Sequence, residues 1–445
     1  MPLRLDSGAA DFADRFARFL VLRQADAVDV DDAAAAIIAD VRARGDQALI
    51  DLTAKFDRFK LSAATLRLSA GEIDSAAARV PAAQRQALEL AAARIEAFHR
   101  RTVPADVDFR DAQGVRLGAR YRPLQSVGIY VPGGLAAYPS SVLMNALPAK
   151  VAGVERVVMV VPTPDGVLNP LVMCATKLAG VTEVYRIGGA QAVAALAYGT
   201  ATIAAVDKIV GPGNAWVAAA KRRVFGTVGI DLIAGPSEIL VIADAANNAD
   251  WIAADLLSQA EHDAKAQSIL VCDDRGFADQ VAAAIETTLK GLAKETIARR
   301  SWNDYGAIIV VPRLEDAVAL VDRIAPEHVE IATEMDVAER LAGRIRHAGA
   351  IFLGRHTPEA IGDYVAGTNH VLPTYRSARF SSGLGVADFL KRTSIVGCDE
   401  QALLAIGPAA VTLAEAEGLP AHALSVAIRL GAIGAGAKRT GPRRS

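Results

Sequence analysis

Cysteine and aromatic residues are scarce in this chain of 445 residues. The three cysteines, Cys174, Cys272 and Cys398, are odd in number and widely spaced, which argues against a disulfide framework and favours a reducing compartment. Aromatic residues make up 5% of the chain, whereas hydrophobic residues together make up 52%. This composition predicts a large globular protein with an aliphatic core and excludes a disordered chain.

An excess of charge of one sign and a long apolar run are also missing. The formal net charge is −2, so the charge balance gives no reason to expect a nucleic-acid partner. Apolar runs such as residues 157–161 have the length of a strand and are too short to span a bilayer. The charged residues near the N-terminus leave no room for the apolar region of a signal peptide: Arg4, Asp6, Asp11, Asp14, Arg15 and Arg18. We therefore predict a cytoplasmic protein without a membrane partner.

The order of the predicted elements indicates an α/β fold. Residues 26–100 have mainly helical character. From Gln125 onward, short β-branched runs such as SVGIYV and RVVMVV alternate with apolar helices, and a second series of this kind starts at Ser237. This alternation predicts parallel sheets in two successive units, each of roughly five strands. Residues 354–389 are rich in loops, and the segment from Gln401 is predicted to be helical.

Three glycine-containing turns separate a predicted strand from a predicted helix, at residues 130–134, 187–191 and 210–214. In a parallel sheet such turns gather at the carboxyl edge, where helix N-termini favour phosphate groups. None of the three is a G-x-G-x-x-G sequence, so the usual dinucleotide fingerprint is not present in them. Taken alone, they fit ordinary turns equally well.

The densest group of candidate functional residues lies in residues 230–262, IDLIAGPSEILVIADAANNADWIAADLLSQAEH. The small residues of GPSE allow the backbone to approach a ligand closely. Gln259 and His262 are three positions apart at the end of the following helix and therefore share one helix face. An amide oxygen and an imidazole can thus point at one metal ion. A Q-x-x-H pair alone is weak evidence, because an exposed or core histidine is more common than a metal ligand.

Three further segments each combine a carboxylate with an imidazole: Glu327 with His328, Asp363 with His370, and Glu417 with His422. The first pair lies between a helix and a strand and suits acid/base chemistry, because imidazole titrates near neutrality. Its alternative interpretation is a solvated turn. The second pair lies in a loop, where functional groups are common. The third pair lies in the terminal helical segment.

The three cysteines are not predicted to react. Cys174 lies in an apolar helix, Cys272 ends a strand, and Cys398 precedes Asp399 and Glu400. None has the electropositive surroundings that stabilise a nucleophilic thiolate. Their positions argue against an aldehyde oxidation that proceeds through a thiohemiacetal.

Together, these segments resemble the histidinol dehydrogenase family over nearly the whole chain. The most specific match is IDLIAGPSEILVIAD followed by DLLSQAEH. GGAQAVAALAYGT, GPGNAWVAAAKRRVFG, PEHVEI, GTNHVLPT and AEGLPAHALSV follow the family pattern in the same order. The resemblance implies oxidation of L-histidinol to L-histidine through bound histidinaldehyde, with two NAD and one zinc ion per site, as the last steps of histidine biosynthesis.

The resemblance also implies residue roles. The implied zinc ligands are Gln259, His262, Asp363 and His422. The implied acid/base pair is Glu327 and His328. The implied substrate contacts are Ser237, Gln259, His262, His328, Asp363, His370, Glu417 and His422. The implied NAD contacts are Tyr130, Gln191 and Asn214.

For the architecture, the resemblance implies two incomplete Rossmann-like domains with small helical N- and C-terminal parts. Residues 1–129 together with 237–381 are expected to form the first domain, and residues 130–236 the domain inserted into it. Residues 382–445 are expected to be a helical segment that completes the site of the partner in a homodimer.

Two other classes of function remain open on the residues alone. One is a zinc hydrolase with Glu327 as its base, although the glycine turns at three strand ends would then have no role. The other is a non-catalytic nucleotide-binding protein, in which His262 and His422 would be structural. NADH formation from histidinol, measured before and after chelation, separates all three.

Overall fold

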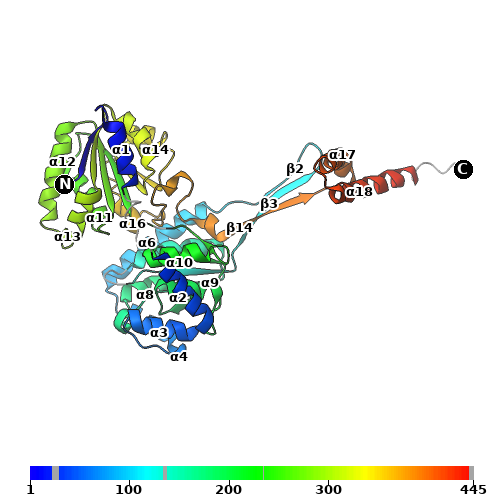
Figure 1. Cartoon of the computed structure of the whole chain (residues 1–445), viewed down its shortest axis with the longest axis horizontal. Helices are drawn as coiled ribbons and strands as arrows, with labels where there is room; N and C mark the ends of the chain where they lie inside the picture. The colour runs from blue at the N-terminus through cyan, green and yellow to red at the C-terminus, as the bar shows by residue number, and fades with distance from the viewer. Residues whose placement is uncertain (23–29, 134–137, 234, 440–445) are drawn as a thin grey trace. The chain divides into compact units, whose positions relative to one another are not determined.

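The computed structural model describes residues 1–22, 30–133, 138–233 and 235–439, and the chain divides into two compact units (Figure 1). Unit 1 contains Met1–Thr102 and Leu124–Phe389, and unit 2 contains Val103–Pro123 and Leu390–Ser445. Unit 1 carries two parallel sheets, here called sheet A and sheet B, whereas unit 2 carries a small antiparallel sheet and a helix pair.

Sheet A has six parallel strands in the order β1-β11-β10-β9-β12-β13. Its strands are β1 (Leu3–Asp6), β9 (Glu238–Ala243), β10 (Gln267–Cys272), β11 (Ala307–Val310), β12 (His328–Ala332) and β13 (Ala350–Leu353). The helices in these parts of the chain are α1 (Phe12–Val21), α11 (Ala249–Ala260), α12 (Arg275–Leu289), α13 (Glu295–Tyr305), α14 (Ala317–Ile324), α15 (Met335–Ala342) and α16 (Ala360–Tyr364).

The central strand of sheet A explains why the sequence EILVIA is apolar without alternation. Leu240 and Ile242 join the core on one face of the sheet, whereas Ile239 and Val241 join the core on the other face. Successive side chains of a strand point to opposite faces, so a strand covered on both sides needs an apolar residue at every position.

Sheet B has five parallel strands in the order β6-β5-β4-β7-β8. Its strands are β4 (Ser126–Tyr130), β5 (Arg156–Val160), β6 (Glu183–Tyr185), β7 (Lys208–Val210) and β8 (Gly229–Ile230). The helices in these parts are α2 (Asp31–Arg44), α3 (Asp46–Phe56), α4 (Ala63–Leu66), α5 (Ala70–Ala77), α6 (Ala82–Arg101), α7 (Pro139–Ala152), α8 (Pro170–Ala179), α9 (Gly189–Tyr198) and α10 (Ala215–Val224).

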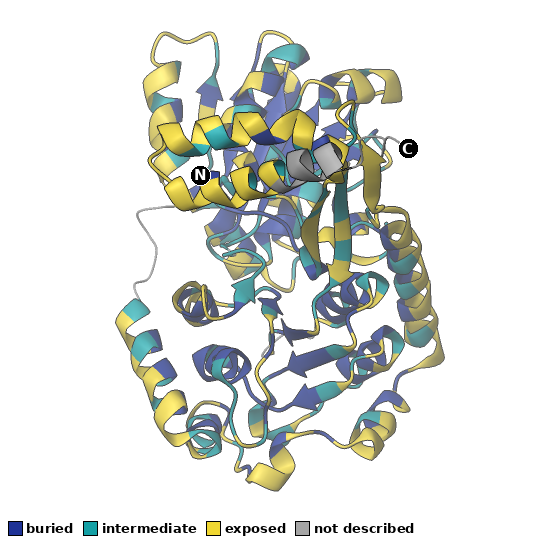
Figure 2. Cartoon of the chain, turned by 90° about the vertical axis from the view of Figure 1, so that its right-hand side faces the viewer, coloured by how far each residue is buried: buried dark blue, intermediate teal, exposed yellow. Residues whose placement is uncertain are grey.

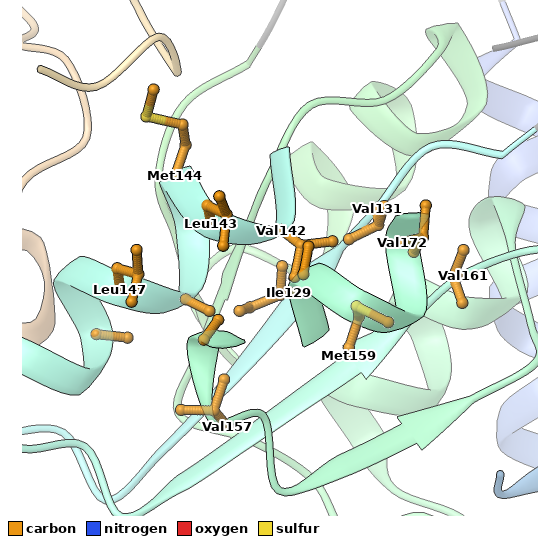
Figure 3. Packing of buried hydrophobic residues seen from close by; sticks show 14 of the residues in the cluster. Ile129, Val131, Val142, Leu143, Met144, Leu147, Val157, Met159, Val161 and Val172 are labelled. Carbon is orange, nitrogen blue, oxygen red and sulfur yellow. The ribbon is translucent and has the colours of Figure 1, made fainter. Parts of the chain in front are cut away.

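The core of sheet B is aliphatic, as the composition predicts. Figure 3 shows Val142 and Leu147 of α7 near Ile129 of β4 and Met159 of β5, all within one buried cluster. A second buried cluster covers the opposite face, with Val158 on that side. Unit 1 also contains the short 3-10 helices η1 (Pro164–Gly166), η2 (Leu314–Asp316), η3 (Ser377–Arg379) and η4 (Val386–Phe389).

Unit 2 has few buried residues. Its antiparallel sheet has the order β14-β3-β2, formed by β14 (Leu390–Gly397), β3 (Arg116–Pro123) and β2 (Val107–Arg110). The helices α17 (Glu400–Ala416) and α18 (Pro420–Arg439) pack on each other, and their visible surfaces are largely exposed (Figure 2). Exposed apolar side chains on this pair, together with the turn between its helices, are Leu404, Ile406, Leu413, Leu419, Leu424 and Ile428.

The predicted α/β class with parallel sheets is confirmed, and each predicted strand of the two series is found. The sequence did not predict the edge strand β1, the two-residue strand β8 or the antiparallel sheet. Helix α11 ends at Ala260, so His262 follows the helix instead of ending it. Among the described residues, no helix has the length and apolarity to cross a membrane. The expected domain limits and cytoplasmic location stay predictions.

Candidate active site

A cavity of about 670 Å³ lies in unit 1, where the amino ends of β9 and β12 in sheet A meet the carboxyl ends of sheet B strands. Its walls contain eight of the predicted site residues: Asn214, Ser237, Gln259, His262, Glu327, His328, Asp363 and His370. The fold thus brings together residues from five separate segments of the sequence. A concave cavity with several converging polar groups is the usual form of a small-molecule site.

Glu327 and His328 are buried at the start of β12, with 5% and 4% of their surfaces exposed. Helix α14 ends at Ile324, and Ala325 takes a left-handed conformation with φ of 48°, which turns the chain into the strand. The alternative of a solvated turn is therefore wrong. Glu327 Oε2 lies 3.8 Å from His328 Nδ1.

The main chain of Glu238 holds both members of this pair. Its N–H donates to Glu327 Oε2 at 2.9 Å, and its carbonyl oxygen lies 2.9 Å from His328 Nδ1. Because a carbonyl can only accept, Nδ1 carries the proton and Nε2 has the free lone pair. His328 is therefore set up to accept a proton at Nε2. Glu238 is part of GPSE, but nothing in that segment predicts this backbone role.

Burial shifts the two pKa values in opposite directions. It lowers the pKa of His328 to about 4, so the imidazole is neutral at pH 7. It raises the pKa of the Glu327 carboxyl well above its usual value, and the nearby negative charge of Glu238 adds to this rise. A neutral imidazole and a carboxyl that holds its proton more tightly than usual are suited to proton transfer near neutral pH.

Glu359 is a second residue that sequence reasoning missed. Its Oε1 lies 3.4 Å from His328 Nε2 and makes no hydrogen bond with the described residues. Its backbone N–H donates to Glu330 Oε2 at 3.0 Å, which anchors it next to β12. Burial raises the pKa of Glu359 to about 8. Glu359 is not among the cavity-lining residues, and its contact in the site is with His328.

The predicted metal ligands of unit 1 meet at the same cavity. Gln259 is 1% exposed, and neither its amide oxygen nor its amide nitrogen has a partner among the described residues. Such buried polar atoms are costly when unsatisfied, so they fit a bound ion or ligand. His262 donates its backbone N–H to the carbonyl of Gln259 at 3.2 Å, which keeps both side chains on one turn. Asp363 of α16 lines the same cavity, and its Oδ1 lies 3.5 Å from His370 Nδ1.

A second possible metal group overlaps with this one. His328, Glu359 and Asp363 present ligand atoms within 4.8 Å of one another. Only Asp363 is shared with the predicted set. We favour the predicted set, because the buried amide of Gln259 is otherwise unsatisfied and because His328 would lose its proton-accepting nitrogen to a metal.

Two of the four predicted residues outside the cavity wall, Glu417 and His422, belong to unit 2. Glu417 follows α17 as its C-terminal cap, and His422 lies in the first turn of α18. Both are exposed. Three of the four predicted zinc ligands thus come from unit 1, and the fourth comes from the helix pair of unit 2.

The glycine turns follow the carboxyl ends of β4, β6 and β7 in sheet B, as predicted, although Gly134 lies outside the described residues. Of the three predicted NAD contacts, only Asn214 lines the cavity. Tyr130 is buried, and its hydroxyl accepts a hydrogen bond from Gly189 N–H at 3.0 Å. Gln191 is buried in the first turn of α9. The NAD role of these residues stays a prediction.

Comparison with known proteins agrees with this geometry. The family model for histidinol dehydrogenase matches residues 22–430. Histidinol dehydrogenases of Rhodospirillum rubrum and Bradyrhizobium diazoefficiens are 66% and 64% identical to this chain, each over 97% of it and 99% of the relative. The crystal structure of histidinol dehydrogenase from Elizabethkingia anophelis has a TM-score of 0.91 at 36% identity, covering 97% of this chain and 99% of that one. The chain belongs to the histidinol dehydrogenase family.

Proposed function

We propose that this protein oxidises L-histidinol to L-histidine in two NAD-linked steps, at the end of histidine biosynthesis. The observation that carries the proposal is the buried Glu327–His328 pair, held by the backbone of one residue of β9, Glu238, at a cavity that also contains the unsatisfied amide of Gln259. The strong similarity to histidinol dehydrogenases over 97% of the chain supports the same activity.

In the first step, His328 Nε2 takes the proton of the histidinol hydroxyl while the hydride on the same carbon passes to NAD. The product is the aldehyde, which stays in the cavity. The hydrogen bond from Nδ1 to the Glu238 carbonyl keeps the imidazole in the correct tautomer throughout. Glu359 Oε1 lies next to Nε2 at 3.4 Å and fixes the position of the imidazole ring on that side.

In the second step, Glu327 takes a proton from water as the water oxygen bonds to the aldehyde carbon. The imidazolium of His328 returns its proton to the former carbonyl oxygen, which gives the hydrate and leaves His328 neutral again. His328 then accepts the hydroxyl proton of the hydrate, and a second hydride passes to NAD. Each oxidation thus removes one proton through the same imidazole. A carboxyl with a raised pKa suits the proton transfer from water, because it binds the proton firmly once it has taken it.

We propose that zinc is held by Gln259, His262, Asp363 and His422. The donor set of two imidazoles, one carboxylate and one amide oxygen suits zinc, which binds nitrogen and oxygen ligands and is commonly four-coordinate. When bound, zinc would orient the imidazole and amine of the substrate as a Lewis acid, with its coordination shell expanded beyond the four protein ligands. Ser237, His370 and Glu417 are the proposed further substrate contacts, and Tyr130, Gln191 and Asn214 the proposed NAD contacts.

The test of this function is an absorbance assay for NADH. Histidinol with excess NAD is expected to yield two NADH per histidine formed, and chelation is expected to stop the reaction. Hydrolysis without NADH formation would instead indicate a zinc hydrolase. NAD binding without turnover would indicate a non-catalytic nucleotide-binding protein.

We also propose that the protein is a homodimer in which the helix pair of unit 2 completes the site of the partner. Among the described side chains of α17 and α18, the only buried residues are Ala402, Gly407 and Ala423, whereas large apolar residues are exposed on both helices. A helix pair with so little apolar burial is not expected to be stable without a further packing surface. A two-fold dimer would provide two equivalent shared sites.

Mixing two inactive variants tests the shared site. His262→Ala and His422→Ala are each expected to be inactive alone. In a heterodimer with shared sites, one site carries both changes and the other carries neither, so about half of the sites regain activity. The measurement is NADH formation by co-expressed, doubly tagged heterodimers. Purified heterodimers without any recovery would show that each chain completes its own site.

The cysteines are expected to be dispensable. Cys174 and Cys272 are buried, and burial raises the pKa of the Cys272 thiol to about 11, which disfavours the nucleophilic thiolate. A variant with all three cysteines changed to alanine or serine should keep most of its aldehyde oxidation, measured as NADH formed from histidinaldehyde. A folded variant that loses this step alone would point to a thiol mechanism.

A further inference from the structure

Two oppositely charged side chains are buried together behind the turn that follows β7. Lys221 of α10 and Asp231, which follows β8, form an ion pair between Nζ and Oδ1, and their side chains are 2% and 1% exposed. Burying two charges is costly unless both are paired and hydrogen-bonded. A buried ion pair adds little net stability over apolar side chains of similar volume, so its presence here needs another explanation.

Both charged groups hold the same residue, Gly211. Its N–H donates to Asp231 Oδ2 at 2.7 Å, and its carbonyl accepts from Lys221 Nζ at 3.1 Å. Gly211 has φ of +109°, and a Cβ at this position would lie 2.3 Å from the carbonyl oxygen of Tyr130. The pair therefore fixes a backbone conformation that only glycine adopts without strain.

Gly211 opens a turn that forms part of the cavity wall. Pro212, Gly213 and Asn214 line the cavity, and Asn214 Oδ1 caps α10 by accepting from the N–H groups of two following residues. On the other side of the pair, Asp231 directly precedes Leu232, which also lines the cavity. Neither charged residue is itself among the lining residues. The ion pair thus lies outside the cavity and connects the two segments, one with Asn214 and the other with Leu232, that line the cavity here.

We propose that Lys221 and Asp231 are positioning residues for the dinucleotide: they hold the turn at Gly211 in the conformation that NAD requires. The inference rests on the proposed NAD-linked function, because it assigns this wall of the cavity to the cofactor. Metal binding and proton transfer involve other residues, so they do not depend on this pair.

The test is the double variant Lys221→Met/Asp231→Leu, which removes both charges and leaves no unpaired buried charge. Its KM for NAD is expected to rise by about 10-fold or more, because small displacements of a binding wall have large effects on ligand positioning. Its zinc content, its KM for histidinol and its turnover at saturating NAD should stay close to those of the unchanged protein. NADH binding followed by fluorescence should weaken in parallel.

A conservative variant and a matched control separate positioning from stability. Lys221→Met/Asp231→Asn keeps an amide oxygen that can accept from Gly211 N–H, so part of the NAD affinity should return. Arg156→Met/Glu183→Leu removes the ion pair whose Nε–Oε1 distance is 2.7 Å, at the amino ends of β5 and β6 in the same sheet. This control should affect thermal stability without changing the KM for NAD.

Two outcomes would overturn the inference. One is an unchanged KM for NAD in a folded Lys221→Met/Asp231→Leu variant. The other is an equal rise in the control, which would show a general loss of stability in sheet B. If the unchanged protein forms no NADH from histidinol, the proposed function itself fails, and this result is seen before any variant is compared.

Discussion

Replacing His328 with asparagine is expected to slow the oxidation of both histidinol and histidinaldehyde by about 100- to 10,000-fold, the usual contribution of a general base. The asparagine amide N–H can still donate to the carbonyl of Glu238, which His328 Nδ1 does in the native protein at 2.9 Å. What the variant lacks is Nε2, the proton acceptor of both oxidations. The rates are measured as single-turnover NADH formation, started separately from the alcohol and from the aldehyde.

Glu327→Gln is the matched comparison for this prediction. The amide keeps the size of the side chain, and its oxygen can still accept from Glu238 N–H, but it cannot take a proton from water. It should therefore slow aldehyde oxidation more than alcohol oxidation. Small and equal losses in both steps for both variants would contradict the assigned roles.

Removal of the metal is expected to abolish activity, and added zinc is expected to restore it. The buried amide of Gln259 has no partner among the described residues. Without a metal ion, this side chain and the neighbouring ligands can no longer bind and orient the substrate. His262→Ala should also lose the metal, because a site with one ligand fewer binds zinc far more weakly. Metal content and NADH formation are measured on the same samples.

His356→Ala provides the control for the loss of metal. His356 is exposed, lies beside the ring of Trp251 and is not among the residues that line the cavity. Its replacement should leave both the zinc content and the activity unchanged. Full turnover by a protein verified to be metal-free would refute the proposed zinc site.

The sequence predicted those parts of the fold and site that depend on local patterns. Strands β9 and β10 lie in a sheet covered on both faces, so their apolar runs were visible in the sequence. Gln259 and His262 were predicted from their spacing of three residues. The two side chains still share one face, although α11 ends at Ala260. Both side chains reach the same cavity because the turn after the helix keeps the i, i+3 relation through a backbone hydrogen bond.

The missed features depend on long-range contacts or on the backbone. Strand β1 has four residues, and it pairs with β11, some three hundred positions further along the chain. Strands β2, β3 and β14 are rich in exposed residues and bury no continuous apolar face, so no periodic pattern identified them. Glu359 reaches His328 only because the sheet brings β12 next to the segment before α16.

Glu238 accepts from Glu327 N–H through its side chain at 3.3 Å, but the two groups of Glu238 that orient the side chains of the acid/base pair belong to the main chain. Every amino acid has the same carbonyl, and every one except proline has the same N–H, so the two contacts to Glu327 and His328 are encoded by the path of β9 and not by the identity of residue 238. Substitutions elsewhere on the cavity wall can therefore alter substrate preference while leaving the proton-transfer apparatus intact. A lineage of such enzymes can accumulate changes in specificity without first having to rebuild its chemistry.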